Sequence, residues 1–320
     1  TSEERFVFDG IKAEPVPSLL RGFSAPVIVD YAYSEADLTY LMAHDTDAFN
    51  RWEAGQRLAT SIILKNGGVP SAAYVDAVRR VLADGARDPA FAAEALALPS
   101  ESFLAEQLEV VDPDSLHAAR NNLKRTLAGT LRAQFAAAYE DMRVTGPYSP
   151  DAAASGRRAL RNLCLGYMME TGDGPARVLA VRQFDSADNM SDAMAALSAL
   201  ANCDCPEREP ALDRFYARWK GEPLVVDKWL AVQAMSRLPS TLENVKRLAE
   251  HPAFDIRNPN KVYSLIRAFC GNFAGFNAAG GGGYAFAAGK VIEIDRLTPQ
   301  VAARVARAFD RWKKFGAVRQ

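Results

Sequence analysis

The sequence has little of what metal-dependent, disulfide-rich or strongly charged proteins rely on. It contains only three histidines and four cysteines in 320 residues, and its formal net charge is −1. A net charge near zero gives no electrostatic reason to bind nucleic acid or an acidic membrane surface. No apolar run approaches the roughly 20 residues of a membrane-spanning helix. We therefore expect neither nucleic acid nor membrane as a partner.

The cysteines are too few and too scattered for a disulfide framework. They are typical of buried thiols in a reducing compartment, so we expect a cytoplasmic protein. Cys203 and Cys205 form a Cys-x-Cys pair, but no second pair accompanies them, which argues against a metal site. The four positions are Cys164, Cys203, Cys205 and Cys270.

The histidines also lack the spacing that a catalytic zinc requires. A helical zinc site needs histidines at i and i+4, with a glutamate between them as base. His44, His117 and His251 lie far apart, so each is interpreted as a capping or surface residue. The sequence also shows no phosphate-binding loop, dinucleotide fingerprint or nucleophile elbow. We expect no catalytic residue, metal or cofactor within this chain.

Residues 1–33 differ in pattern from the rest. The alternation in Arg5-Phe6-Val7-Phe8, the turn signal Asp9-Gly10 and the run from Pro26 to Tyr31 predict two or three short strands. So few strands do not form a stable sheet alone. We expect them to be the last strands of a β-sandwich domain, and the chain to be a piece of a longer protein.

From Ser34 onward the apolar period changes from 2 to 3.6. Ser34 with Asp37 forms a variant of the capping box, and prolines and acidic caps open many later segments. Helix starts are predicted near Ser34, Asp45, Pro70, Asp88, Pro99 and Asp112. Further helices are predicted over residues 151–170, 175–184, 191–202, 209–220, 224–235, 241–249, 261–269, 284–295 and 298–314.

Many helices of this length with short connections favour stacked antiparallel pairs. We find no strict repeat period, so the fold class is mainly α, an irregular α-α superhelix with a short N-terminal β segment. The predicted domains are 1–33, the end of a β-sandwich, and 34–320, a helical superhelix. Such folds usually bind on their concave face.

One stretch interrupts this helical rhythm. After Asn258-Pro259-Asn260 an aromatic segment leads to four consecutive glycines, Gly280 to Gly283. Glycine loses the most backbone entropy on ordering and adds no side chain. The run is either a flexible surface loop between helices or a place where backbone passes close to a ligand or a neighbouring domain.

Several stretches resemble the C-terminal part of the bacterial aminopeptidase N family of zinc-dependent aminopeptidases. The similarity follows the chain in order, and Asn-Pro-Asn and Asp-Lys-Trp at these positions are fairly specific. The stretches that carry it are Pro15–Val27, Phe49–Gln56, Gln183–Phe184 with Ala187–Leu197, Val226–Trp229 and Asn258–Asn260.

The resemblance implies that residues 1–33 end the family's small β-sandwich and that the remainder is the helical domain closing over the catalytic domain. It places the zinc-binding His-Glu-x-x-His helix and the Gly-x-Met-Glu-Asn loop upstream of this chain, and the family's last helices beyond it. Zinc is therefore expected in the full-length enzyme only, and the fragment alone is expected to be inactive.

The resemblance also supplies candidate residues for the substrate channel. In the wider family an arginine on a late helix lines the chamber, and Arg304 is the matching position. Lys261, Asn260 and Tyr284 are further candidates from the stretch that interrupts the helices. For Arg304 the alternative interpretation is an ordinary exposed helix arginine.

Two functions remain open on the sequence. The first is the C-terminal domain of a cytoplasmic, monomeric aminopeptidase N, which removes N-terminal residues from peptides; this part caps the active-site chamber and controls peptide access. Its partners would be peptides and the upstream catalytic domain. The alternative is a stand-alone helical-repeat scaffold that binds a protein partner.

Overall fold

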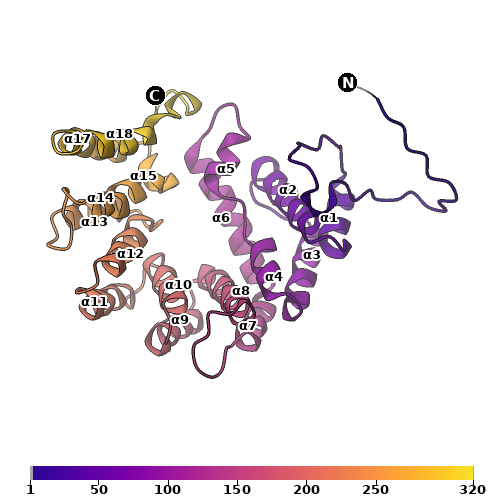
Figure 1. Ribbon diagram of the computed structural model, residues 1–320, viewed down its shortest axis with the longest axis horizontal. Helices are drawn as coiled ribbons and strands as arrows, with labels where there is room; N and C mark the ends of the chain where they lie inside the picture. The colour runs from indigo at the N-terminus through magenta and orange to yellow at the C-terminus, as the bar shows by residue number, and fades with distance from the viewer. Residues whose placement is uncertain (1–2, 320) are drawn as a thin grey trace.

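Helices build almost the whole molecule. The computed structural model describes residues 3–319, and helix follows helix from Glu35 onward (Figure 1). In that described part no helix is both long and apolar enough to cross a membrane. The predicted α-helical superhelix is confirmed.

The first half of the superhelix consists of α1 (Glu35–His44), α2 (Ala48–Asn66), α3 (Ala72–Ala83), α4 (Pro89–Ala95), α5 (Glu101–Glu106), α6 (Pro113–Thr130), α7 (Arg132–Asp141) and α8 (Ala152–Met168). The second half consists of α9 (Gly174–Ser186), α10 (Met190–Ala201), α11 (Arg208–Trp219), α12 (Pro223–Ala234), α13 (Thr241–Ala249), α14 (Pro259–Val262), α15 (Ala268–Gly271), α16 (Phe273–Phe276), α17 (Gly282–Asp295) and α18 (Pro299–Ala306). A π-helix, η4 (Tyr263–Arg267), joins α14 to α15, and short 3-10 turns are η1 (Arg21–Phe23), η2 (Asp84–Ala86), η3 (Met169–Thr171), η5 (Arg307–Phe309) and η6 (Trp312–Lys314).

Neighbouring helices pack in pairs along the chain. Among the strongest contacts are α1 with α2, α7 with α8, α9 with α10, and α17 with α18. Large apolar side chains fill the spaces between them; for example, Phe135 and Tyr167 stack with ring centroids 4.4 Å apart. Each pair buries its faces mainly against its neighbours, which is the physical basis of a solenoid. In Figure 1 the pairs follow an arc that brings α15 to α18 round toward α5 and α6.

The prediction of strands in residues 1–33 is wrong for the residues that the structure describes. Residues 3–33 contain the short turn η1 and no strand. The first part of this segment projects from the arc in Figure 1, and Phe6, Phe8 and Ile28 are exposed. A strand needs a neighbour to pair its backbone groups and cover its apolar face. The described chain offers these residues no sheet edge, so the alternating pattern has nothing to pair with.

The second half of this N-terminal segment nevertheless packs on the first helices. Arg21 donates to Asp45 (2.8 Å), and the backbone N–H of Gly22 donates to Asp47 (2.8 Å). The ring centroid of Phe23 lies 5.0 Å from that of Phe49 on α2. Polar and aromatic contacts therefore fix the segment on the helices without any sheet.

The stretch of Gln183–Phe184 with Ala187–Leu197, one of those that resemble the aminopeptidase N family, supplies residues to a buried polar network. Gln183 on α9 donates to Asn162 (2.8 Å) and to the carbonyl of Asp192 (3.0 Å), and it accepts from Tyr139 (3.0 Å). Asn162 in turn donates to the Asp192 carboxylate (2.8 Å). Buried polar groups are costly unless satisfied, so these residues fix how α7, α8, α9 and α10 pack.

The glycine run forms the tight start of α17. Gly281 has a φ of 68°, in the left-handed region that glycine adopts without strain. A Cβ added at Gly283 would lie 2.5 Å from the carbonyl oxygen of Phe276. The backbone here passes close to its own chain, so these two glycines are required by the turn and by the packing of α17 on α16.

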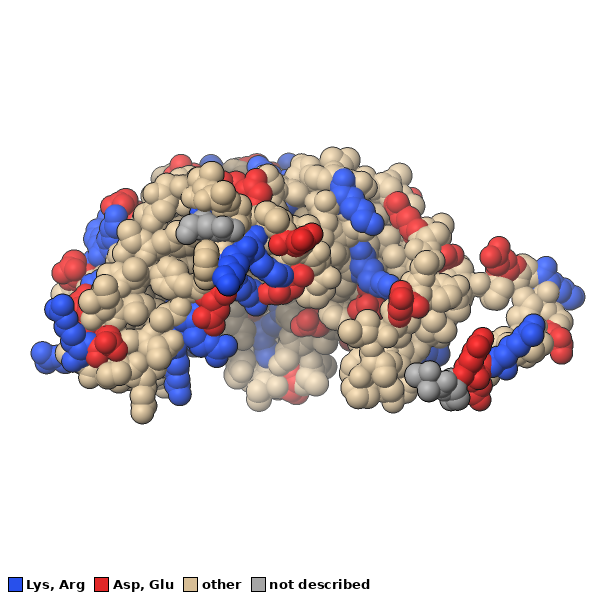
Figure 2. All heavy atoms as spheres, turned by 90° about the horizontal axis from the view of Figure 1, so that it is seen from above, with Lys and Arg blue, Asp and Glu red and all other residues tan. Residues whose placement is uncertain are grey.

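The two limbs of the arc are joined where the chain end meets the start of α6. The N–H of Val111 donates to the carbonyl of Lys314 (2.7 Å), and a parallel bridge pairs Val111 with Phe315. Lys314 also donates to the Glu106 carboxylate (2.9 Å), and Arg319 lies between Asp112 and Asp114. We call these contacts of residues 311–319 with residues 106–114 the C-terminal clasp. Seen from above, this face shows basic and acidic side chains side by side (Figure 2).

Candidate functional site

Lys261 is a buried structural residue in this fold. Its ammonium donates to the Asp227 carboxylate (2.7 Å) and to the Pro223 carbonyl (2.9 Å), and the residue is 8% exposed. The contact ties α14 to the start of α12. It also brings together the Asp-Lys-Trp and Asn-Pro-Asn stretches, which are far apart in sequence. The charge of Lys261 is thus paired within the chain.

Asn260 and Tyr284 are also engaged within the chain. Asn260 is exposed in the first turn of α14, where its N–H donates to the Asn258 side chain (3.0 Å) and its carbonyl accepts from Ser264 (2.7 Å). The Tyr284 hydroxyl donates to Asn277 (2.9 Å), and its ring meets that of Phe276 edge-on. Burial raises the pKa of Tyr284 above its ordinary value, so this phenol stays neutral near pH 7.

Arg304 differs from Lys261, which is buried, and from Tyr284, which is half-buried. It is exposed on α18, and one of its guanidinium nitrogens donates to the Tyr263 hydroxyl over 3.2 Å. Arg267 lies on the same tyrosine, with its guanidinium carbon 5.8 Å from the ring centroid. Neither arginine forms an ion pair with a carboxylate of residues 3–319. Two cations therefore contact one tyrosine side chain, and neither has a carboxylate partner among residues 3–319.

Both arginines line one cavity of about 700 Å³, within the usual size range of ligand sites. The cavity lies between α5, the segment from η4 to α16, and the chain from α18 to Phe315. Its walls carry four arginines and one acidic residue, so the lining is strongly cationic. The charged and polar lining residues are Ser102, Arg267, Asn277, Arg304, Arg307, Asp310 and Arg311. We call this space the arginine cavity.

The other two arginines of the cavity are paired. Arg307 donates to Asp310 (3.3 Å), and Arg311 lies 2.8 Å from Glu106 on α5. The hydrogen bond from Lys314 and the charge of Arg311 hold the pKa of Glu106 below its ordinary value. Glu106 is therefore ionised near neutral pH and compensates Arg311, so Arg267 and Arg304 remain the cations available to an anionic ligand.

Sequence reasoning identified Arg304 but did not single out Tyr263 or Arg267. These two residues lie four positions apart within η4, a spacing that brings side chains to the same side of a helix. That spacing was the available signal. The π-helical geometry was not visible in the sequence, and π-helical turns are rare and frequently occur at functional sites.

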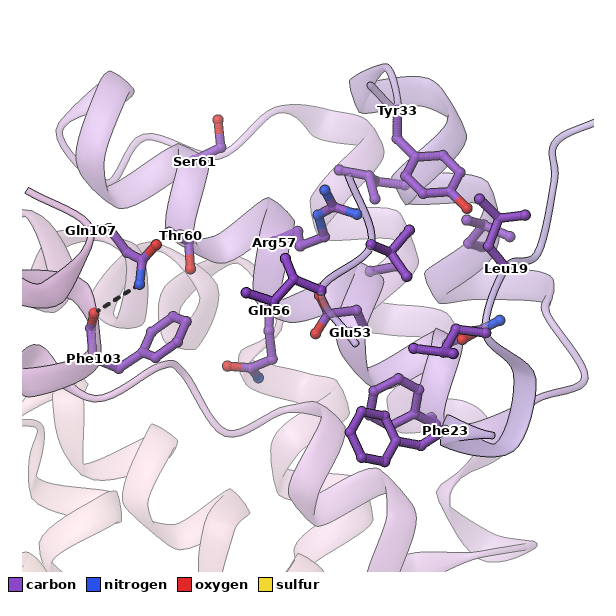
Figure 3. Close-up of a pocket in the computed structure, with 18 of the residues that line it drawn as sticks. Leu19, Phe23, Tyr33, Glu53, Gln56, Arg57, Thr60, Ser61, Phe103 and Gln107 are labelled. Atoms are coloured by element: carbon purple, nitrogen blue, oxygen red, sulfur yellow. Dashed lines mark hydrogen bonds between the residues drawn. The ribbon is translucent and has the colours of Figure 1, made fainter. Parts of the chain in front are cut away.

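A second cavity, of about 550 Å³, has a different character. Side chains of the N-terminal segment (Leu19, Phe23, Tyr33) and of the α5 region (Phe103, Gln107) border it from opposite sides, with α2 between them (Figure 3). Most of its wall is aliphatic or aromatic. Adjacent residues of α5 line the two cavities, Ser102 the cationic one and Phe103 the apolar one.

The described residues offer zinc no set of ligands. Within residues 3–319 there is no group of three histidine, cysteine or acidic side chains that could hold a metal ion. The four cysteines are free thiols. Burial raises the pKa of Cys164 and of Cys270 to about 12, so these thiols are neutral and weak nucleophiles.

Comparison with known proteins places the chain in a family. Residues 35–320 match the family described as a domain of unknown function, DUF3458_C, with ARM repeats. The chain belongs to the DUF3458_C family. Residues 1–32 match a second family, described as a domain of unknown function, DUF3458, with an Ig-like fold.

Similar proteins of known name are aminopeptidases. The chain is 42% identical to aminopeptidase N of Caulobacter vibrioides over 96% of its length, and 39% identical to aminopeptidase N of Escherichia coli over its whole length. It covers 36% and 38% of these relatives. A crystal structure of Legionella pneumophila aminopeptidase A in complex with aspartic acid superposes with a TM-score of 0.88 at 32% identity, over 98% of this chain and 38% of that one.

The resemblance to the aminopeptidase N family is thus confirmed. The chain spans little more than a third of the length of these relatives.

Proposed function

We propose that this chain is the part of a cytoplasmic aminopeptidase N that walls the substrate chamber, while a zinc site upstream carries out the hydrolysis. The chain matches aminopeptidase N relatives almost end to end while covering about two fifths of them. Its own described residues offer no catalytic metal site. Peptide binding without peptide cleavage is the role that these observations support best.

The two family matches support a division near residue 33. We propose that residues 1–33 complete a β-sandwich domain and that residues 34–320 form the helical wall. The exposed Phe6 and Phe8 and the alternating pattern around them suit a strand that is covered on one face. The missing strands of that domain would supply the pairing that residues 3–33 lack here.

The arginine cavity is the observation that carries the peptide-binding role. A peptide held by its N-terminus at a catalytic zinc presents its C-terminal carboxylate to the chamber wall. Arg304 is exposed in a cationic cavity and carries no carboxylate partner within residues 3–319. A guanidinium binds a carboxylate through charge-assisted hydrogen bonds, often two in parallel. We infer that Arg304 contacts the distal end of short peptides.

The test is expression of the whole gene beside the 320-residue chain. The full-length protein should hold zinc and release amino acids from aminoacyl anilides and peptides, and a chelator should abolish this activity. The 320-residue chain alone should bind no stoichiometric zinc and cleave neither substrate. A full-length protein without hydrolytic activity, or a gene without a His-Glu-x-x-His upstream, would refute the proposal and leave a binding scaffold as the function.

A further inference from the structure

The arginine cavity contains one more uncompensated cation than a single carboxylate needs. Arg304 donates to the hydroxyl end of Tyr263, and Arg267 lies over the face of the same ring. A peptide that ends in a neutral residue brings one carboxylate. A peptide that ends in aspartate or glutamate brings two, separated by only a few bonds.

We propose that Arg267 acts with Arg304 as the second cation of this site, so that the cavity favours peptides whose C-terminal residue is acidic. This inference rests on the proposed function, because it names the ligand class of the same site. One guanidinium binds the main-chain carboxylate and the other binds the side-chain carboxylate. Both guanidinium groups contact the side chain of Tyr263.

The surrounding contacts support this assignment. Arg307 and Arg311 line the same cavity but are compensated by Asp310 and Glu106. Arg307 and Arg311 each have a carboxylate partner, and Lys314 shares that of Arg311, whereas the two arginines on Tyr263 have none among residues 3–319. Arg267 also belongs to the π-helix η4, whose wider turn alters the direction of its side chains relative to a regular helix.

Exposure sets the size of the expected effect. Both arginines are exposed, and ion pairs in contact with water contribute little. We therefore expect a preference of roughly fivefold for an acidic over an amide C-terminal residue. The preference should weaken as salt is added, because both charges remain accessible to counterions.

Titration calorimetry with the 320-residue chain tests the proposal directly. The probes are the tripeptides Ala-Ala-Glu and Ala-Ala-Gln, which have nearly the same shape and differ by one charge. The chain should bind the glutamate peptide more tightly. Arg267→Ala should make the two affinities equal with little change for the glutamine peptide, and Arg267→Lys should keep part of the preference. Arg304→Ala should weaken both peptides.

The matched control is Arg143→Ala, which removes an exposed arginine that pairs with Glu140 outside this cavity and should leave the preference unchanged. Circular dichroism melts check that each variant folds. The same peptides are then compared as substrates of the full-length protein, where the difference should be in KM and not in kcat.

The outcomes separate this inference from the proposed function. An Arg267-dependent preference in binding, without hydrolysis by the full-length protein, would support the two-cation site and refute the peptidase role. Hydrolysis of both peptides with equal KM, together with equal affinities, would leave the peptidase role intact and overturn the inference. If the chain alone binds neither peptide, the KM of the glutamine peptide is divided by that of the glutamate peptide for the full-length protein, as wild type and as Arg267→Ala. A ratio of one in the wild type overturns the inference.

Discussion

Two neighbouring parts of the superhelix hold a basic side chain in opposite ways. Around Lys261, the start of α12 supplies a carboxylate and a carbonyl, and the ammonium is almost fully buried. Around Arg304, α18 faces a cavity of about 700 Å³, and the guanidinium has a tyrosine hydroxyl and no carboxylate as its partner among residues 3–319. Sequence alone made both residues candidates for the same channel.

The difference shows what separates a structural cation from one that is available to a ligand. A buried charge must be paired, because desolvation is costly, and removal of either partner leaves an uncompensated charge. An exposed guanidinium bears no such cost and contributes little to folding. Mutations around Lys261 should therefore change stability, whereas mutations around Arg304 should change peptide binding.

Loss of the Lys261 partner should give the largest effect. Asp227→Ala strips the buried ammonium of its carboxylate and should lower the free energy of unfolding by about 3 kcal/mol. Urea denaturation measures this change. The neighbouring exposed Lys228 provides the control, since Lys228→Ala should alter stability by less than about 0.5 kcal/mol. A similar decrease in the free energy of unfolding for both variants would mean that Lys261 is not a buried structural cation.

Removal of the Arg304 guanidinium should act on substrate binding. In the full-length enzyme, Arg304→Ala should raise KM for di- and tripeptides by a few-fold to roughly tenfold, since 1.4 kcal/mol corresponds to a factor of ten. The turnover number, and the hydrolysis of anilides that lack a carboxylate, should hardly change. Equal losses on peptides and anilides would make Arg304 a folding residue like Lys261.

The C-terminal clasp should weaken in acid. The hydrogen bond from Lys314 and the charge of Arg311, both across the clasp, lower the pKa of Glu106. A carboxylate whose pKa is lowered by folding stabilises the folded state above its unfolded pKa, and this contribution is lost as pH falls through the folded pKa. The clasp should therefore persist at neutral pH and loosen below the ordinary carboxylate range.

Trp312 lies within the clasp and is about half exposed. Its fluorescence should shift on acidification before the helices unfold, as followed by circular dichroism. Trp312→Phe identifies the signal, because the remaining tryptophans lie in α2, α11 and α12. A shift that coincides with global unfolding would contradict a separate opening of the clasp.

The smallest effect is expected at Tyr263. Tyr263→Phe removes the hydroxyl that accepts from Arg304 but keeps the ring beneath Arg267. Peptide KM should change by roughly twofold, because an exposed hydrogen bond contributes well under 1 kcal/mol and both guanidinium charges remain. A rise in peptide KM as large as that caused by Arg304→Ala would show that Arg304 binds peptides only when it is hydrogen-bonded to Tyr263.

The sequence by itself determined the helices and many of their ends, because caps and apolar spacing are local properties. Ser34 accepts from the N–H of Asp37 and Asp37 accepts from that of Ser34, as the capping box predicts. The next cap shows the limit of such local signals. Asp47, not Asp45, caps α2, because Asp45 is engaged by Arg21 from a segment 24 residues away.

Only the tertiary structure decided the rest, because each of these outcomes depends on groups distant in sequence. Residues 3–33 form no strand despite their alternating pattern, and the described part of the chain holds no strand with which they could pair. Lys261 is a structural residue because α12 places Asp227 beside it. Arg304 has no carboxylate partner among residues 3–319, and the Glu106 carboxylate of α5 pairs with Arg311.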